Sequence, residues 1–532
     1  MRMHNVTPDR REFICGLLGS LASAGIADQA FAQNSHPMGP SQPFSFEGLI
    51  ERAKQRSAEP YKQPYRPAPE IVSKIDYATH GKIVFKADQA LNANGPGAYP
   101  IEFFHLGMYF PKKVSINLIE SETSQEILFS ADYFDMPKDS VARGLPSDAG
   151  FAGFRLHESR RRKDWKHQDW MVFLGASYFR SIGSLNQYGL SARGIAVDVS
   201  VPTPEEFPDF VEFYIDPARK EGDPTFVYAL LDGPSISGAY KFAVIRTDGA
   251  VMDVDARLFA RRPIQQLGIA PLTSMFWYGE YNRMRLIDWR PEVHDSDGIA
   301  LWTGKGERIW RPLNNPRRVV TSSFQDTNPL GFGLLQRDRN IENYLDGVNY
   351  DRRPSLWVQP LHDWGKGSVQ LVEIPTQDEI HDNIVAFWVP EQAIEAGTSL
   401  NFRYRLHWRA EEPFPAEQLA DVFATRIGRG GEPGQDHTAT PDAVKFVVEF
   451  EGGALAGLTT EAPPQGTAST SRGMLTDVIV EPIPRTERWR ARFDLKGADG
   501  VDPVELRLFL HIGEQAFSET WAFQFWPDQP AG

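Results

Sequence analysis

The sequence is nearly free of cysteine, and this excludes several kinds of site. Its 532 residues include one cysteine, Cys15, which lies in an N-terminal segment that we expect to be removed. The remaining chain then has no disulfide, no thiolate zinc site and no cysteine nucleophile. A chain without cysteine also avoids mispaired disulfides in an oxidising compartment.

An excess of basic residues and long apolar runs are also missing. Lys and Arg total 56 against 70 Asp and Glu, which gives a net charge of −14. A protein that binds duplex nucleic acid needs a basic face to displace counterions, so we expect no nucleic-acid partner. A neutral ligand such as a sugar is compatible with this charge. No stretch beyond the N-terminal segment approaches the roughly 18 apolar residues of a membrane-spanning helix, so we expect no membrane span in the mature protein.

Aromatic and turn-forming residues are plentiful. Phe, Trp and Tyr make up 12% of the chain, and there are 44 Gly and 40 Pro. Many aromatics with many turn-formers are typical of a strand-rich chain with frequent reversals. The length is too great for one ordinary core and predicts at least two domains.

The N-terminus has the features of an export signal. Arg10 and Arg11 are followed by Phe13, a mildly apolar run over 15–27 and the small-residue exit Ala30-Phe31-Ala32. This combination predicts a twin-arginine signal over residues 1–32, which directs a folded protein to the periplasm of a Gram-negative bacterium. The alternative interpretation is a short amphipathic helix with two ordinary arginines.

The hydrophobic pattern predicts an all-β protein. Residues 44–58 form the one clear helix candidate, with Phe46, Leu49, Ile50 and Ala53 on one face. Strands are predicted at 82–86, 114–119, 211–215, 225–231, 240–245, 251–260 and 401–408, and few segments between them have a helical period. We therefore expect a large β-sandwich domain over 33–410. The short strands after residue 443 predict a small immunoglobulin-like β-sandwich over 411–532.

Tryptophan is concentrated in one part of the sequence. Seven of the 13 tryptophans fall between residues 277 and 388: Trp277, Trp289, Trp302, Trp310, Trp357, Trp364 and Trp388. Each ring can belong to the core, or it can form a flat apolar platform for a sugar ring.

Two polar loops in the same region carry candidate carboxylates. One reads His294-Asp295-Ser296-Asp297-Gly298, and the other ends with Glu379-Ile380-His381-Asp382-Asn383 before an apolar strand. Two carboxyl groups across a sugar site are the minimum that glycoside hydrolysis requires. Both loops can equally be ordinary turns. The twelve-residue calcium-loop pattern is absent from the first loop, and we expect neither a metal site nor a cofactor.

These residues lie in a sequence that resembles the periplasmic glucan biosynthesis proteins of the OpgG/OpgD (MdoG/MdoD) family. The matching stretches include Gln266-Leu-Gly-Ile-Ala-Pro-Leu-Thr-Ser-Met-Phe, His294-Asp-Ser-Asp and Arg353-Pro-Ser-Leu-Trp-Val. Further matching stretches lie at 103–108, 150–155, 173–180, 187–194, 311–316 and 331–336. The twin-arginine signal points to the D branch. The resemblance implies a large β-sandwich with a small immunoglobulin-like domain, and a role in building the glucose backbone of osmoregulated periplasmic glucans.

The resemblance also implies site residues. Members look like inverting glycoside hydrolases that act on β-1,2-glucan, with Asp382 in the position of the general acid and Asp295 in that of the general base. Substrate-contact positions of the family fall on Glu379, Tyr350, Arg353 and Trp357.

Three functional hypotheses remain open at this point. The protein hydrolyses β-1,2-glucan, or it is a transglycosylase that cyclises or transfers the glucan, or it is a non-catalytic scaffold that binds it. The implied partners are the glucan backbone and an inner-membrane glucan synthase. The sequence Leu345-Asp-Gly-Val-Asn349, which follows Tyr344, differs from other members and bears on the choice, because this loop can cover the site.

Overall fold

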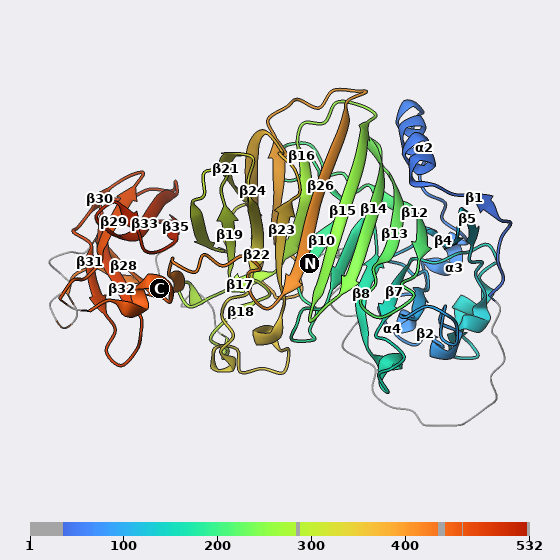
Figure 1. Ribbon diagram of the computed structural model, residues 1–532, viewed down its shortest axis with the longest axis horizontal. Coiled ribbons are helices and arrows are strands. Elements are labelled where there is room, and N and C mark those ends of the chain that lie inside the picture. Colours follow the sequence, from blue (N-terminus) through green and yellow to red (C-terminus); the bar gives the residue numbers. More distant parts are fainter. Residues whose placement is uncertain (1–35, 284–287, 433, 435–441, 460, 529–532) are drawn as a thin grey trace, which may run out of the picture.

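The computed structural model describes residues 36–283, 288–432, 434, 442–459 and 461–528 (Figure 1). The predicted export signal at 1–32 lies outside the described residues. Strands dominate the described chain, so the predicted all-β class is confirmed. In this part of the chain no helix is both long and apolar enough to cross a membrane.

The predicted helix is α2 (Phe46–Ala58), which packs on the outside of the largest sheet (Figure 1). Its start is capped by Ser45, whose hydroxyl accepts a hydrogen bond of 3.0 Å from the Gly48 N–H. Leu49 and Ala53 are buried against residues of the sheet that include Leu230. The amphipathic pattern therefore predicted both the helix and its buried face.

The remaining helical elements are single turns. They are α3 (Pro69–Val72), α4 (Tyr77–His80), η1 (Ala87–Gln89), η2 (Ala131–Tyr133), η3 (Val141–Gly144), η4 (Trp165–His167), η6 (Ile341–Asn343), η7 (Tyr350–Arg352) and η9 (Gly453–Gly457).

The largest sheet has sixteen strands and forms one layer of the molecule. Its order is β1 (Gln42–Pro43), β5 (Thr123–Glu126), β4 (Ser115–Glu120), β12 (Asp209–Asp216), β13 (Thr225–Asp232), β14 (Ile236–Arg246), β15 (Ala250–Ala260), β26 (Ser399–Arg409), β23 (Ser355–Pro360), β22 (Gly331–Leu335), β19 (Gly298–Trp302), β20 (Arg308–Pro312), β35 (Thr520–Phe525), β33 (Val504–Ile512) and β29 (Gln465–Thr470), with β34 (Gln515–Ala516) beside β33.

A ten-stranded sheet forms the second layer. Its order is β21 (Val320–Thr327), β24 (Lys366–Glu373), β25 (Ile384–Pro390), β16 (Leu267–Ser274), β10 (Ser191–Arg193), β9 (Tyr178–Ser181), β8 (Asp169–Leu174), β7 (Gly153–His157) and β3 (Ile101–Phe104), with β11 (Ile195–Val197) beside β16. Two small ribbons pair β2 (Val84–Phe85) with β6 (Phe134–Asp135) and β17 (Phe276–Tyr278) with β18 (Val293–His294).

Aromatic rings fill the space between the two layers. Phe173 and Phe179 of the ten-stranded sheet contact Phe242 of the sixteen-stranded sheet, with ring centroids 5.5 and 5.3 Å apart. Such ring pairs add to the stability that burial already gives. The high aromatic content therefore serves the core of a sandwich.

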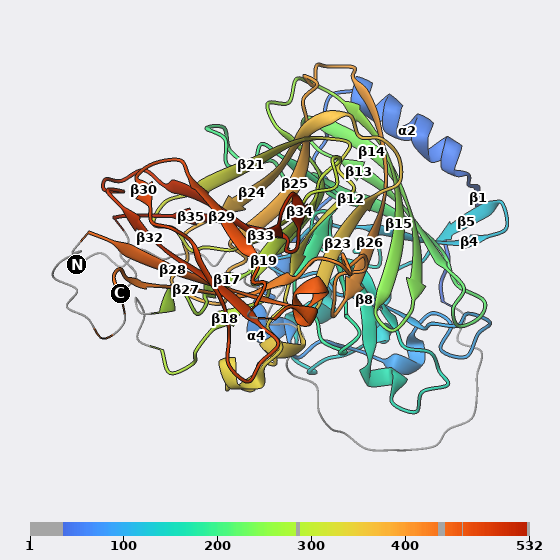
Figure 2. The same cartoon turned by 60° about the vertical axis from the view of Figure 1, so that its left-hand side comes forward.

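The C-terminal part of the chain has a second pair of layers, drawn in red in Figures 1 and 2. Its separate sheet of five strands consists of β27 (Asp421–Arg429), β28 (Val444–Glu451), β32 (Trp489–Lys496) and β30 (Met474–Leu475), with β31 (Ile479–Pro482) beside β32. Phe446 of this sheet contacts Phe525 of β35 at 5.4 Å. The predicted division at residue 410 falls between β26 and β27. The largest sheet nevertheless continues into the C-terminal part, because β35 pairs in parallel with β20.

A buried ion pair ties the two large layers together. Arg311 of β20 donates hydrogen bonds of 3.0 and 2.8 Å to the two carboxylate oxygens of Glu373 on β24. Both side chains are buried, and the Asn314 N–H adds a third hydrogen bond of 2.6 Å to Glu373. An ion pair in such a place needs full hydrogen bonding to offset its desolvation.

Arg311→Met is therefore expected to lower the free energy of unfolding by about 3–5 kcal/mol, because it leaves the Glu373 carboxylate buried without its cation. Denaturant unfolding followed by tryptophan fluorescence measures this loss. The double variant Arg311→Met, Glu373→Leu recovers part of it. Arg318→Met is the matched control: Arg318 and Asp502 form an exposed pair at 3.8 Å, so a change within about 0.5 kcal/mol is expected. Equal losses of the free energy of unfolding in Arg311→Met and Arg318→Met contradict the stabilising role of the buried pair.

Candidate active site

The two candidate aspartates lie on opposite sides of one short backbone segment. This segment, residues 274–276, leads from the end of β16 to the start of β17. Ser274 pairs with Ile384 of β25, and Phe276 pairs with His294 of β18. Asp382 comes just before β25 and Asp295 just after β18, so the segment has one aspartate near each of its edges.

Hydrogen bonds fix Asp295 and the neighbour of Asp382 to that segment. The Asp295 N–H donates to the Met275 carbonyl at 2.8 Å. The neighbour of Asp382, Asn383, accepts a hydrogen bond from the Phe276 N–H at 2.8 Å and donates to the Phe276 carbonyl at 2.9 Å. Asp295 and Asp382 are 5% and 6% exposed, so both carboxyl groups are almost enclosed by protein.

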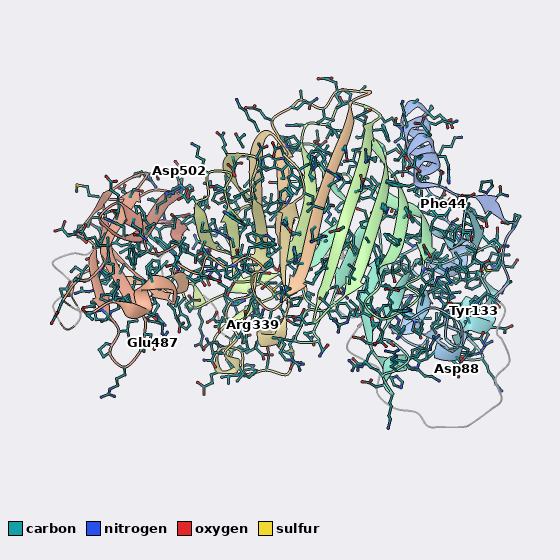
Figure 3. The ribbon with its side chains drawn as sticks, viewed as in Figure 1. Phe44, Asp88, Tyr133, Arg339, Glu487 and Asp502 are labelled. Atoms are coloured by element: carbon teal, nitrogen blue, oxygen red, sulfur yellow. The ribbon has the colours of Figure 1, made fainter. Side chains whose placement is uncertain are left out.

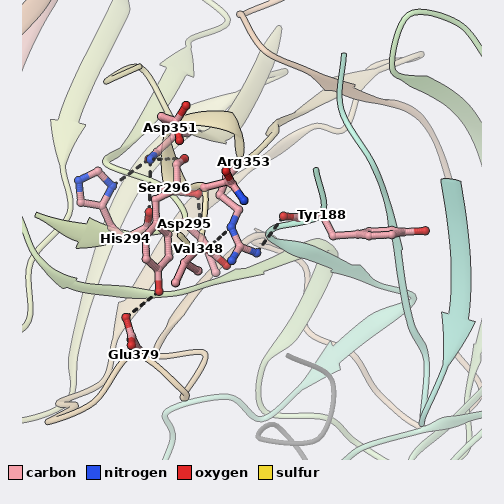
Figure 4. Close-up of polar contacts among 12 residues, drawn as sticks. Tyr188, His294, Asp295, Ser296, Val348, Asp351, Arg353 and Glu379 are labelled. Carbon is pink, nitrogen blue, oxygen red and sulfur yellow. Dashed lines mark hydrogen bonds and ion pairs between the residues drawn. The ribbon is translucent and has the colours of Figure 1, made fainter. Parts of the chain in front are cut away.

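Arg353 lies beside Asp295 (Figure 4), and Tyr350 lies beside Arg353. The Arg353 Nε is 3.4 Å from an Asp295 carboxylate oxygen, and its Nη1 donates to the Tyr188 carbonyl at 2.8 Å. The guanidinium also lies over the Tyr350 ring, 5.1 Å from its centroid. Asp295 therefore has a cation as its direct neighbour.

Tyr350 connects Asp295 to Glu379. Its hydroxyl donates a hydrogen bond of 2.8 Å to the Glu379 carboxylate. Burial raises the pKa of Tyr350 far above its ordinary value, and the negative charges of Asp295 and Glu379 add to this effect. Tyr350 therefore stays a hydrogen-bond donor at any physiological pH.

Arg339 holds the turn that carries Tyr350 and Arg353. It lies below the central strands in Figure 3. Its Nη1 donates to the carbonyls of Asp351 and Arg353 at 2.9 and 2.6 Å, and its Nη2 donates to the Ala410 carbonyl at 2.6 Å. The turn η7 is thus fixed to the end of β26.

Arg290 is a site residue that the sequence did not reveal. It donates to Glu379 at 2.6 Å, to Asp346 at 3.1 Å and to Asp288 at 3.1 Å. The hydrogen bonds from Arg290 lower the pKa of Asp288 to about 2. Through Asp346 and Glu379, this one cation links the loop over 345–349 to the loop that precedes Asp382. No motif marks Arg290, because its partners are up to 89 positions away in the sequence.

Trp357, another predicted substrate contact, is enclosed in the packing of the sheet. Trp357 is 1% exposed, and its ring lies so close to Gly331 that a β-carbon there would meet it at 2.4 Å. A contact with a glucan would require the packing around β22 and β23 to open. Other tryptophans of this region differ in burial. Trp310, Trp364 and Trp388 are buried, whereas Trp289 is 64% exposed.

Asp297, the second aspartate of the His-Asp-Ser-Asp loop, has a structural role. Its carboxylate accepts hydrogen bonds from the backbone N–H groups of Arg337 and Asp338 at 2.9 and 2.8 Å. Among the described residues no group of three or more His, Cys, Asp or Glu side chains is arranged to hold a metal ion.

Fold and site together define an all-β sandwich protein with a pair of enclosed aspartates, one of them beside arginine and tyrosine. The model of the family "Periplasmic glucan biosynthesis protein, MdoG" matches residues 44–525. The chain belongs to this family, which confirms the resemblance found in the sequence.

Relatives match along nearly their whole length. "Glucans biosynthesis protein D 2" of Ralstonia nicotianae is 52% identical over 97% of both chains. "Glucans biosynthesis protein D" of Stenotrophomonas maltophilia is 44% identical over 98% of both chains, and the protein of the same name from Xanthomonas campestris pv. campestris is 43% identical over 98% of both.

The anchoring by Asn383 can be tested with one substitution. Asn383→Asp replaces an amide N–H group that serves the carbonyls of Phe276 and Ile374 by an oxygen that repels them. We expect the free energy of unfolding to fall by about 2 kcal/mol or more, measured by denaturant unfolding. Gln377→Glu makes the same chemical change at an exposed position of the neighbouring loop and is expected to be neutral. A stability loss no greater than that of Gln377→Glu argues against this anchor.

Proposed function

We propose that this protein hydrolyses β-1,2-glucan with inversion of the anomeric configuration, within the synthesis of periplasmic glucans. The observation that carries the proposal is that Asp295 and Asn383, the neighbour of Asp382, bind the consecutive residues Met275 and Phe276, with both aspartates nearly enclosed. Inverting hydrolysis requires two carboxyl groups on opposite sides of one glycosidic bond, and one of them activates a water molecule.

The surroundings of each aspartate suggest its role. A general base must be ionised, and Asp295 has the guanidinium of Arg353 as its neighbour. Asp382 lies on the other side of segment 274–276 and protonates the leaving oxygen. This division agrees with the roles that the family resemblance implies.

Three connected polar side chains, of which Arg353 contacts Asp295, suit a neutral, hydroxyl-rich substrate. Tyr350 and Arg353 donate hydrogen bonds, and Glu379 accepts them. Sugar hydroxyls both donate and accept, so these groups can orient a glucose unit without any charge on the substrate. Because Trp357 is enclosed, it has no part in this proposal.

Transfer to a glucan hydroxyl is a second candidate reaction, and the loop over 345–349 favours it. Asp346 of this loop is tied through Arg290 to Glu379, while Leu345 and Val348 expose apolar side chains. A tethered loop with apolar side chains can exclude water from the site and admit a sugar as the acceptor instead.

Asp382→Asn and Asp295→Asn are each expected to lower the rate of β-1,2-glucan cleavage by about 10²–10⁴-fold, because each removes a proton-transfer group. The measurement is the release of reducing ends by purified protein. Asp378→Asn, in the same loop as Asp382 but exposed, is the matched control and keeps the full rate. Full activity of Asp382→Asn removes the acid assignment. Binding of glucan by the native protein without any cleavage points to a scaffold.

The mass of the products distinguishes hydrolysis from cyclisation. Hydrolysis adds one water to the products, whereas cyclisation gives the mass of the unhydrated oligomer. Mass spectrometry distinguishes these outcomes, and proton NMR during the first minutes shows whether the new reducing end is the inverted anomer. A retained anomer contradicts the proposed mechanism.

Export by the twin-arginine pathway and action beside an inner-membrane glucan synthase complete the proposal. The double variant Arg10→Lys, Arg11→Lys is expected to keep the protein in the cytoplasm with residues 1–32 uncleaved, because the paired arginines are the receptor-read part of the signal. Cell fractionation and the mass of the mature N-terminus measure this. Normal export of the variant excludes the pathway.

A further inference from the structure

His294 is a fully buried ionisable residue next to Asp295, and the proposed reaction gives it no part. Its ring stacks on Phe276 at 5.5 Å and meets the edge of Tyr344 at 5.5 Å. A histidine placed this deeply is usually neutral, because burial penalises its charged form. The hydrogen-bond partners of His294 indicate the opposite.

The first partner is Gln336, whose side-chain orientation is fixed by its other contacts. The other end of this amide lies 3.1 Å from the Tyr350 carbonyl, 3.3 Å from the backbone carbonyl of His294 and 2.8 Å from the Tyr344 hydroxyl. A carbonyl oxygen only accepts, so this end must be the NH₂ group. The Gln336 oxygen therefore faces the His294 Nδ1 at 2.8 Å, and Nδ1 must donate.

The second partner is the carboxylate of Glu292, 2.9 Å from the His294 Nε2. A carboxylate accepts, so this ring nitrogen donates as well. With both nitrogens donating, the ring is an imidazolium. Although burial lowers the pKa of His294, the hydrogen bond and the charge of Glu292 raise it to about 9 overall.

The nearest charged groups that act on the imidazolium are acidic. Glu292 on its own ribbon is the direct partner and Asp297 follows in the next loop, whereas Glu280 after β17 carries less than a full negative charge at neutral pH, because burial and the charge of Glu292 raise its pKa to about 8. With Glu292 ionised, a neutral ring would give up the hydrogen bond to Glu292 or turn the Gln336 oxygen towards the Tyr350 carbonyl. Both changes are costly in a buried place.

We propose that a doubly protonated His294 orients Gln336 and thereby holds the turn that carries Tyr350 and Arg353 against Asp295. His294 is thus a positioning residue. Its effect on turnover rests on the proposed function, whereas its charge state does not.

The charge state is tested by ¹⁵N NMR of the full chain labelled in histidine. The expected result at pH 7.5 is one histidine with both ring nitrogens protonated, which titrates near pH 9. This signal disappears in His294→Asn. The exposed His167→Asn is the control, and it leaves both the signal and the turnover unchanged. An unprotonated ring nitrogen on His294 at pH 7.5 overturns the proposal.

The positioning role is tested by two nearly isosteric variants whose folding is checked by thermal unfolding. Gln336→Glu keeps an acceptor for His294 but loses the donor to the Tyr350 carbonyl. We therefore expect His294 to stay protonated while turnover falls about tenfold or more. Glu292→Gln removes the charge that keeps His294 protonated, so turnover at pH 8 relative to pH 6 falls about threefold or more below the ratio of the native protein.

A native pH ratio in Glu292→Gln, or native turnover in Gln336→Glu, overturns the positioning role. If the native protein does not cleave β-1,2-glucan, the proposed function is wrong, but the positioning role of His294 can still be tested. Affinity for linear β-1,2-glucan oligosaccharides, measured by calorimetry at the two pH values, then replaces turnover and is expected to change in the same direction in each variant.

Discussion

The backbone at residues 274–276 is the constraint on which the site depends. At this point the chain leaves the ten-stranded sheet, and both of its edges are occupied, by β25 on one side and by β18 on the other. Within the same segment, the side chain of Asn383 binds Phe276 and the N–H of Asp295 binds the Met275 carbonyl. The position of one aspartate relative to the other is therefore set by sheet geometry, which is stiffer than any loop.

Much of the fold could be predicted from the sequence. Alternation marked β12 to β15, the turns Asp232-Gly233 and Asp248-Gly249 separated them, and helical spacing marked α2 with its buried residues. These features are local, with periods of two or 3.6 residues. The order of the sheets was beyond such reasoning, because neighbours such as β15 and β26, or β20 and β35, are more than 100 positions apart in the sequence.

The candidate site, like the fold, could be predicted from the sequence only in part. The family resemblance selected Asp295, Asp382, Tyr350, Arg353 and Glu379. Contacts connect Asp295, Arg353, Tyr350 and Glu379 to one another, and Asp382 is joined to the segment around Phe276 through its neighbour Asn383. Arg290, Arg339 and Gln336 were not identified, because each acts through partners distant in sequence and none lies in a motif. The resemblance also selected Trp357 as a substrate contact; its ring is enclosed, because Gly331 and Gly333 opposite it leave room for the ring.

The parallel pairing of β35 with β20 has a consequence for how the molecule is made. Until residue 520 has left the ribosome, β20 lacks its outer neighbour and presents a row of unpaired backbone groups, which invites association with other chains. The largest sheet is completed only when β35 (Thr520–Phe525) follows, long after β20 (Arg308–Pro312) has been synthesised. A nascent chain therefore needs protection along this edge until β35 arrives.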